Sequence, residues 1–133
     1  MNNMHRLLAL ALSAAAFAAL APLADAQVPG IKRTLLQKSD VGDNREVILG
    51  LAEIAPGGST GRHTHFGVET GYVLEGGSVI EIEGEAPRTL MAGDSYTIAS
   101  GKVHDARATG GGGAKVLATY VVEKGKALAT PAP

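Results

Sequence analysis

The chain has 133 residues, which is the ordinary size of one domain and too short for two well-packed ones. Its formal net charge of -1 lacks the basic excess that nucleic acid or an anionic membrane surface requires, so we expect neither as a partner. The absence of cysteine excludes a disulfide framework and a thiolate site. Stability must come from packing, alone or together with a metal ion.

The N-terminus has the pattern of a secretory signal peptide. Leu7 to Leu20 are almost entirely apolar, and Ala24-Asp25-Ala26 places small residues at the two positions that signal peptidase recognises. The apolar run of roughly 14 residues is shorter than the ~20 that span a bilayer, so a retained anchor is the weaker alternative. We therefore expect residues 1–26 to be removed, residues 27–133 to form a single domain, and the protein to be exported to the periplasm or the extracellular space without a stable membrane anchor.

The rest of the chain consists of short apolar runs separated by glycine, proline, aspartate and serine, a pattern that predicts an all-β domain. The expected strands are residues 31–36, 45–55, 61–65, 68–75, 78–83, 88–90, 95–99, 103–108 and 114–123. Turn residues separate them at Pro56-Gly57-Gly58, Gly76-Gly77, Gly84 with Pro87, Gly93-Asp94 and Gly110 to Gly113. Many short strands favour a sandwich or closed barrel, and residues 130–133 should form a loose tail.

Histidines are few and two of them are close together, in the stretch GRHTHFGVETGYVLEGG at residues 61–77. Removal of the signal peptide would leave only His63, His65 and His104. In a strand His63 and His65 point to the same side, roughly 6 to 7 Å apart, so both imidazoles could bind one ion. Glu69 has the same parity. The alternative is a pair of exposed histidines on an edge strand beside an unrelated glutamate.

The spacing of the surrounding glycines favours the metal-binding interpretation. Gly57 is followed by five residues, His63, Thr64, His65, three residues, Glu69, six residues and Gly76. This pattern resembles the first conserved motif of the cupin superfamily in full.

A second cupin motif is present in part. Gly93, Gly101 and His104 are in register with it, whereas Ala99 stands in place of the usual proline and Ala108 in place of the usual asparagine. These departures leave the histidine in place, so they affect the rigidity of the turn and a contact beside the metal more than the metal itself.

The resemblance covers about residues 31–123 and implies a jelly-roll (double-stranded β-helix) barrel. It also implies a divalent metal in the interior, held by His63, His65, Glu69 and His104. Three imidazoles and a carboxylate suit a transition metal and suit calcium poorly; we favour iron, manganese or nickel, with copper or zinc as alternatives. Four protein ligands on a six-coordinate ion would leave two open positions, whereas a tetrahedral zinc would leave none.

The same parity argument predicts what surrounds the metal. If Gly76-Gly77 is a two-residue hairpin loop, Val73 pairs with Ile80 and Gly71 with Ile82, all on the face of Glu69. Gly71 would then keep space free near the metal. The predicted cavity residues are Gly71, Val73, Ile80, Ile82, Ala106 and Tyr96; Arg62, Arg88 and Tyr120 are further candidates for substrate contact, although a surface or core role is the default for each.

Tyr72, Leu74 and Val79 fall on the opposite face, which would make the outer surface partly apolar. This face and the family resemblance both lead us to expect a homodimer.

Three functions remain open for such a barrel. The first is a metal-dependent enzyme of dioxygenase type that acts on a small organic substrate such as an enol or catechol. The second is an isomerase or decarboxylase at the same metal, which would need an acid or a cation placed in the cavity. The third is a non-catalytic periplasmic module that binds a metal or a ligand, since fold does not determine function.

Overall fold

The computed structural model describes residues 29–133, so the predicted signal peptide lies outside the described residues. Residues 29–133 form strands and no helix, which confirms the predicted all-β class; no helix in this part of the chain could therefore cross a membrane. The strands are β1 (Ile31–Gly42), β2 (Arg45–Ile54), β3 (His63–Thr64), β4 (Gly67–Ile82), β5 (Arg88–Met91), β6 (Ser95–Ile98), β7 (His104–Ala108), β8 (Ala114–Glu123) and β9 (Thr130–Pro131).

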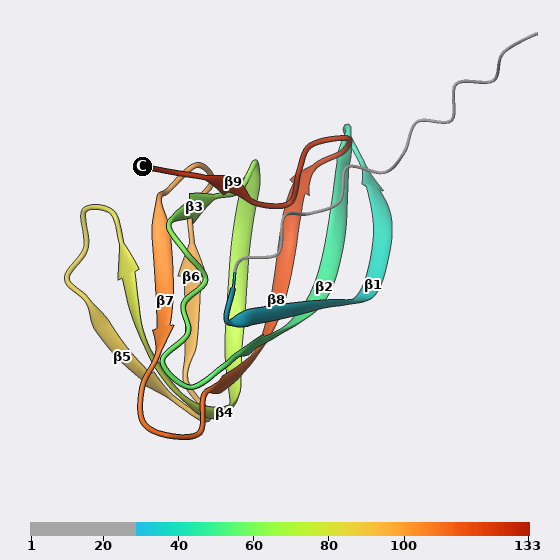
Figure 1. The fold of residues 1–133 in the computed structure, drawn as a ribbon. Coiled ribbons are helices and arrows are strands. Elements are labelled where there is room, and N and C mark those ends of the chain that lie inside the picture. The colour runs from blue at the N-terminus through green and yellow to red at the C-terminus, as the bar shows by residue number, and fades with distance from the viewer. Residues whose placement is uncertain (1–28) are drawn as a thin grey trace, which may run out of the picture.

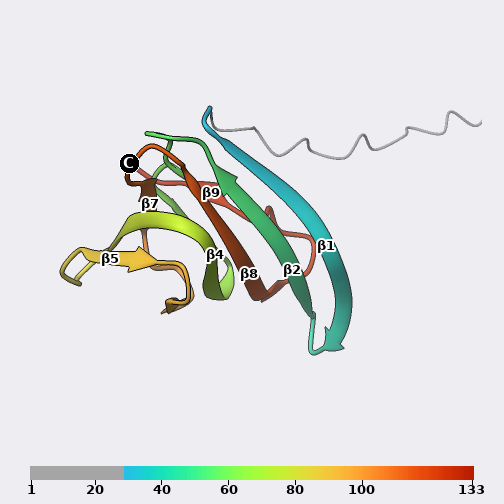
Figure 2. The ribbon, with the colours of Figure 1, turned by 90° about the horizontal axis from the view of Figure 1, so that it is seen from below.

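The strands form one antiparallel sheet that curls around an interior. Their order is β1-β2-β8-β4-β7-β3-β9, and β5 and β6 also pair with β4. Seen from below, β1, β2 and β8 lie side by side as a curved layer, with β5 and β7 on the other side of β4 (Figures 1 and 2). Because β4 belongs to both layers, residues along it line the interior from two sides.

The predicted hairpin at Gly76-Gly77 is wrong, because β4 continues through both glycines. Residues before this point pair with β6 and β8, whereas residues after it pair with β5 and β7. Gly76 has φ +72°, and a Cβ there would lie 2.0 Å from the carbonyl oxygen of Gly113. The glycines therefore form a corner that passes one strand from one layer to the other.

The pairs predicted from that hairpin are also wrong. Val73 pairs with Val116 and Ile80 with Ala106, while Ile82 pairs with His104. The predicted burial of these aliphatic side chains nevertheless holds, because the corner resets the alternation so that both halves of β4 turn one face inward.

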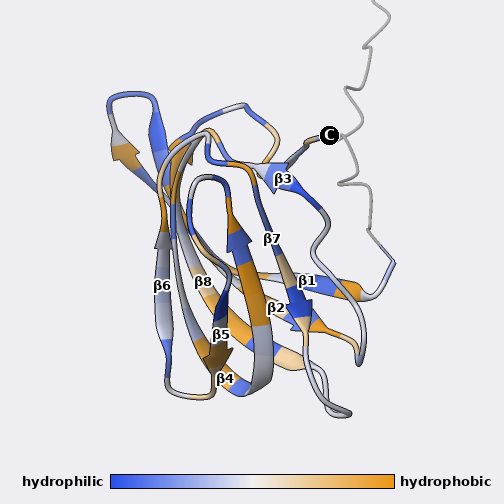
Figure 3. Ribbon diagram, turned by 90° about the vertical axis from the view of Figure 1, so that its left-hand side faces the viewer, coloured by the Kyte–Doolittle hydropathy of each residue, from blue (hydrophilic) through white to orange (hydrophobic). Residues whose placement is uncertain are grey.

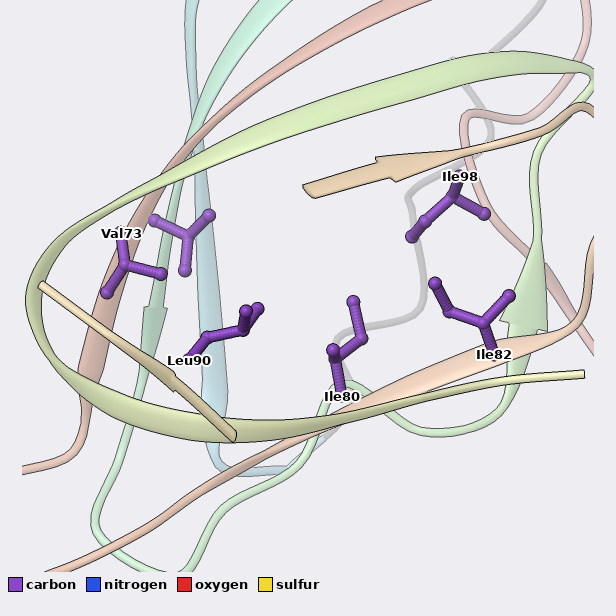
Figure 4. Packing of buried hydrophobic residues seen from close by; sticks show 6 residues of the cluster. Val73, Ile80, Ile82, Leu90 and Ile98 are labelled. Atoms are coloured by element: carbon purple, nitrogen blue, oxygen red, sulfur yellow. The ribbon is translucent and has the colours of Figure 1, made fainter. Parts of the chain in front are cut away.

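Apolar side chains from both layers meet in the interior. The central cluster consists of Val73, Ile80, Ile82, Leu90, Ile98 and Val116. In Figure 4, Ile80 and Ile82 point across the interior toward Ile98. Each such side chain contributes roughly 1.5–3 kcal/mol when fully buried. Hydrophobic and hydrophilic residues are intermixed along the strands, as alternating burial requires (Figure 3).

Strand β1 is longer than predicted. The expected strand ended at residue 36, but β1 runs to Gly42 and is joined to β2 by Asp43 and Asn44, with φ of 48° and 57°. Positive φ at both positions is typical of the tight turns that match the twist of paired strands. Sequence patterning missed this half of β1 because its residues are exposed and do not alternate.

The C-terminus differs from the expected loose tail. Thr130–Pro131 forms β9, which pairs with β3, and the N–H of Ala132 donates to the carbonyl of Arg62 at 2.9 Å. The expected strand at residues 61–65 is shortened to β3. The C-terminal segment thus lies beside the two histidines of the first motif.

Candidate metal centre

Four predicted residues meet in the interior although His104 is distant in the chain from the other three. His63 in β3 is the cross-strand partner of His104 in β7, His65 follows β3 directly, and Glu69 lies in β4. All four side chains are buried, and one ligand atom from each lies within 4.8 Å of the others. The predicted spacing therefore produces one compact group that could hold a metal ion.

Each imidazole is oriented by a backbone carbonyl at its Nδ1 atom. His63 donates to Gly61 at 2.6 Å, and His104 donates to Lys102 at 2.9 Å. His65 donates to Leu128, in the C-terminal segment. A carbonyl can only accept, so these contacts place the proton of the neutral ring on Nδ1 and leave the Nε2 lone pair free for a metal.

The Nε2 atoms converge on the carboxylate of Glu69. His65 Nε2 lies 2.8 Å and His104 Nε2 lies 3.4 Å from Glu69 Oε2, yet neither nitrogen has a hydrogen-bond partner among the described residues. Lone pairs that face a carboxylate oxygen repel it unless a proton or a cation lies between them. A buried set of three nitrogens and one oxygen fits a divalent transition metal, which would satisfy all four atoms together.

The second carboxylate oxygen of Glu69 is held by Tyr96. The phenol donates to Glu69 Oε1 at 2.7 Å, and its ring occupies the space beside Gly71. The prediction that Gly71 keeps space free near the metal therefore needs correction: the space exists, but Tyr96 fills it. Glu69 is thus fixed on one side by a donor and presents its other oxygen to the histidines.

Burial and hydrogen bonding shift the pKa values in this group. Burial raises the pKa of Glu69, but the adjoining imidazoles of His104 and His65 and the hydrogen bond from Tyr96 outweigh it, so the net pKa lies well below the usual range. Burial and the neighbouring carboxylate raise the pKa of Tyr96 far above 10, so the phenol keeps its proton. Burial lowers the pKa of His63 from 6.5 to about 4. The carboxylate is therefore charged and His63 neutral at pH 7, which are the forms that bind metals.

A cavity of about 30 Å³ adjoins the group. One water molecule needs roughly 10–15 Å³ on this measure, so the space admits only a few atoms. Of the predicted cavity residues, Ile80, Ala106 and Tyr96 line it, as does the further candidate Tyr120.

The other predicted cavity residues lie elsewhere. Gly71 sits behind the ring of Tyr96, and Val73 and Ile82 pack in the apolar cluster. Arg62 and Arg88 are exposed and donate to the carbonyls of Pro133 and Ser95, respectively. Parity identified the inward face correctly, but it could not say which part of that face lies beside the metal.

Sequence reasoning missed several contributors to the site, among them Arg33 and the carbonyl of Leu128. Arg33 is half-buried in β1 and lines the cavity; its parity with the buried Ile31 was a signal that it points inward. The carbonyl of Leu128 orients His65, and no sequence signal could have found it because every residue has a carbonyl.

The two departures from the second motif lie away from the metal. Ala99 is exposed, and its carbonyl accepts from the N–H of Lys102 at 3.2 Å. Ala108 packs with Ile31, Ile54 and Ala114 in an apolar cluster. His104 is therefore held by its own cross-strand pairs and by the carbonyl of Lys102 rather than by a side chain at position 108.

Comparisons with known protein families and with solved structures both find cupins. The family model described as Cupin domain matches residues 50–120, and no curated protein matches the chain. A cupin superfamily protein from Desulfitobacterium hafniense DCB-2 is 23% identical, with 74% of this chain and 84% of that one covered and a TM-score of 0.59. The DMSP lyase DddQ from Ruegeria pomeroyi DSS-3 is 20% identical, with 76% and 51% covered and a TM-score of 0.64. A recombinant oxalate oxidase in complex with glycolate is 24% identical, with 71% and 52% covered and a TM-score of 0.60.

This chain spans about half the length of the last two proteins. At these identities the structural likeness establishes the fold alone, and it confirms the predicted jelly-roll barrel. The family match covers more than half of the 133 residues and includes all four residues of the candidate metal group. The chain therefore belongs to the cupin family.

Proposed function

We propose that this protein binds one divalent transition-metal ion and acts as a metal-dependent oxidoreductase of dioxygenase type on a small organic substrate. The supporting observation is the convergence of one ring nitrogen from each of three histidines and one carboxylate oxygen beside a cavity. Iron, manganese or nickel is favoured, with copper or zinc as alternatives. The bound ion would supply open coordination positions and, if redox-active, electrons.

The chain's own residues would prepare the site in two ways. Backbone carbonyls and Tyr96 hold the four ligands in place, so little reorganisation is needed when the ion binds. Ile80, Leu90 and Ile98 form apolar walls that exclude bulk water from the substrate.

A second candidate is lyase, isomerase or decarboxylase chemistry at the same metal. It requires an acid or a cation in the cavity, and Arg33 is a cation that lines it. One solved neighbour is a DMSP lyase, and another is an oxalate oxidase with glycolate bound, so small organic molecules are plausible ligands of this fold. A binding module without turnover is the third reading, and the experiment below separates the three.

We also propose that the protein is exported and forms a homodimer. The outer face of the β4–β8 layer has exposed apolar side chains, among them Val68 beside its cross-strand partner Val121, and Tyr72. We expect a second copy of the chain to cover this face. Light scattering after gel filtration would give the mass in solution, and a monomer at all concentrations would overturn the dimer.

The test begins with the full-length chain, expressed without a histidine tag through its own export route. Intact mass of the purified product shows whether cleavage follows Ala26. Elemental mass spectrometry then gives the metal content beside His63→Ala and Glu69→Gln, with Glu81→Gln as the control because Glu81 is exposed on the same strand. We expect about one metal per chain in the wild type and the control, and little in the two site variants.

Activity assays on the metal-loaded protein then distinguish the candidate reactions. Dioxygen uptake with enols or catechols supports the dioxygenase proposal, whereas metal-dependent turnover without dioxygen consumption supports the lyase or isomerase class. Bound metal and ligand without turnover would establish a binding module. Failure of the wild type to take up any of these metals at neutral pH would overturn all metal-dependent functions.

A further inference from the structure

The metal cavity adjoins a second, larger pocket. This pocket has a volume of about 170 Å³, compared with about 30 Å³ for the metal cavity. Arg33, Ala52 and Tyr120 line both, so the two spaces are adjacent and these residues lie between them. A ligand at the metal would have to pass only these residues to extend into the second pocket.

The second pocket is mostly apolar beyond this junction, where Thr34 is the one polar residue among the described residues of its lining. Its remaining walls include Leu35, Ile48, Leu51, Leu128 and the backbone of Gly50. An apolar protein cavity of about 150 Å³ is large enough to bind benzene, so the volume here corresponds to about one ring or a short alkyl chain. The metal cavity, in contrast, admits only the few atoms of a head group.

Arg33 is a cation at the junction of these two spaces. It is half-buried, and its guanidinium makes no hydrogen bond or ion pair with any residue in the described part of the chain. A half-buried guanidinium beside apolar walls lacks part of its hydration, and a carboxylate is the group whose planar geometry matches it best. The position of Arg33 thus favours an anionic ligand.

We propose that the site takes a monocarboxylate with an apolar body of about one ring. The carboxylate lies in the metal cavity, within reach of Arg33 and the metal, and the apolar body occupies the second pocket. This proposal rests on the proposed function for the metal contact of the head group. The contacts with Arg33 and with the second pocket are made by the protein alone and need no metal.

Benzoate is the probe that tests this proposal, with acetate and benzyl alcohol as comparisons. Acetate lacks the apolar body and benzyl alcohol lacks the charge. Calorimetric titration would use the full chain loaded with zinc, which does not react with dioxygen, and the metal-free chain. We expect benzoate to bind the zinc form at least about tenfold more tightly than either comparison, and the metal-free form more weakly.

Two variants separate the two halves of the ligand. Arg33→Gln should weaken benzoate about tenfold or more and leave benzyl alcohol unchanged. Gly50→Val should weaken benzoate and leave acetate unchanged. A Cβ at residue 50 makes only ordinary contacts, with Thr34 O at 3.6 Å and Tyr120 Cε2 at 3.8 Å, and the two methyl groups would take up pocket volume. Arg88→Gln, at an exposed arginine, is the control. Zinc stoichiometry reports that each variant is folded.

The outcomes distinguish this proposal from the proposed function. If the chain binds one zinc but benzoate binds no more tightly than acetate, or equally well to Arg33→Gln, the carboxylate proposal is overturned and the metal site stands. If the chain binds no zinc, the metal proposal fails. Benzoate binding to the metal-free chain that is lost in Arg33→Gln would then still support the ligand class, and no binding would overturn it.

Discussion

Gly71 and Tyr96 are cross-strand partners in β4 and β6, and the ring of Tyr96 lies where a side chain on residue 71 would be. A Cβ at position 71 would come within 2.2 to 2.5 Å of three atoms of the tyrosine side chain. This close approach allows the phenol to reach Glu69, at 2.7 Å. Gly71 thus makes room for Tyr96, and Tyr96 in turn positions Glu69, a predicted metal ligand.

Gly71→Ala should therefore displace Tyr96. We expect a loss of about 1–3 kcal/mol in unfolding free energy from overpacking, measured by urea denaturation of the metal-free chain. In a Tyr96→Ala background the same substitution should cost much less, because the ring is gone. Gly111→Ala is the matched control, since nothing lies within 4 Å of a Cβ there. Equal losses from Gly71→Ala in both backgrounds would contradict the steric argument.

Tyr96→Phe removes only the hydroxyl that holds Glu69. A hydrogen bond to a charged group contributes about 1.5–3 kcal/mol, and we expect a loss of that size together with a 10- to 100-fold weaker affinity for zinc. Urea denaturation and a zinc titration against a competing chelator measure the two effects. Tyr72→Phe, at an exposed tyrosine, is the control. If Tyr96→Phe and Tyr72→Phe bind zinc equally, the hydrogen bond from Tyr96 to Glu69 has no role in metal binding.

Removal of residues 128–133 should weaken metal binding, although none of them is a predicted ligand. The truncation deletes the carbonyl that orients His65 and the strand that pairs with β3. We expect at least about tenfold weaker zinc affinity. A shorter truncation, of residues 132–133 only, retains the Leu128 carbonyl and β9 and should bind zinc nearly normally. Identical affinities for the two truncations would show that His65 needs no support from this segment.

The metal-free protein should lose stability as the pH falls below 6.5. The pKa of His63 is lowered by burial from 6.5 to about 4, so between these values the unfolded chain binds a proton that the folded chain does not. The stabilisation is fully present above pH 6.5 and declines by up to ~3 kcal/mol toward pH 4.

Urea denaturation at several pH values checks this slope against His63→Asn, which cannot titrate. The range from pH 6.5 to 4.5 is the informative one for His63, because Glu69, whose pKa is lowered from 4.5, contributes only at lower pH. We expect a shallower decline in the variant. The same slope in both proteins would show that His63 is not responsible.

Most of the candidate metal group could be predicted from sequence because its ligands follow fixed spacings. His63 and His65 are two residues apart, so alternation predicts one shared face, and Glu69 follows four residues later at the spacing of the family motif. The distant His104 needed the family motif, since parity cannot bring together residues from different strands. A glycine pair is also compatible with more than one backbone path: Gly76-Gly77 predicts a hairpin from sequence, but it is a corner within β4.

The sequence by itself determined the all-β class, the inward face of the strands around the site and, through the family motif, the identity of the four residues that could bind a metal. These follow from local alternation and from spacing along the chain. Only the tertiary structure decided that Tyr96 lies on Glu69, that Leu128 orients His65 and that Arg33 stands between two cavities. Each of these contacts joins segments far apart in the chain, and their meeting depends on how the sheet curls rather than on any local pattern.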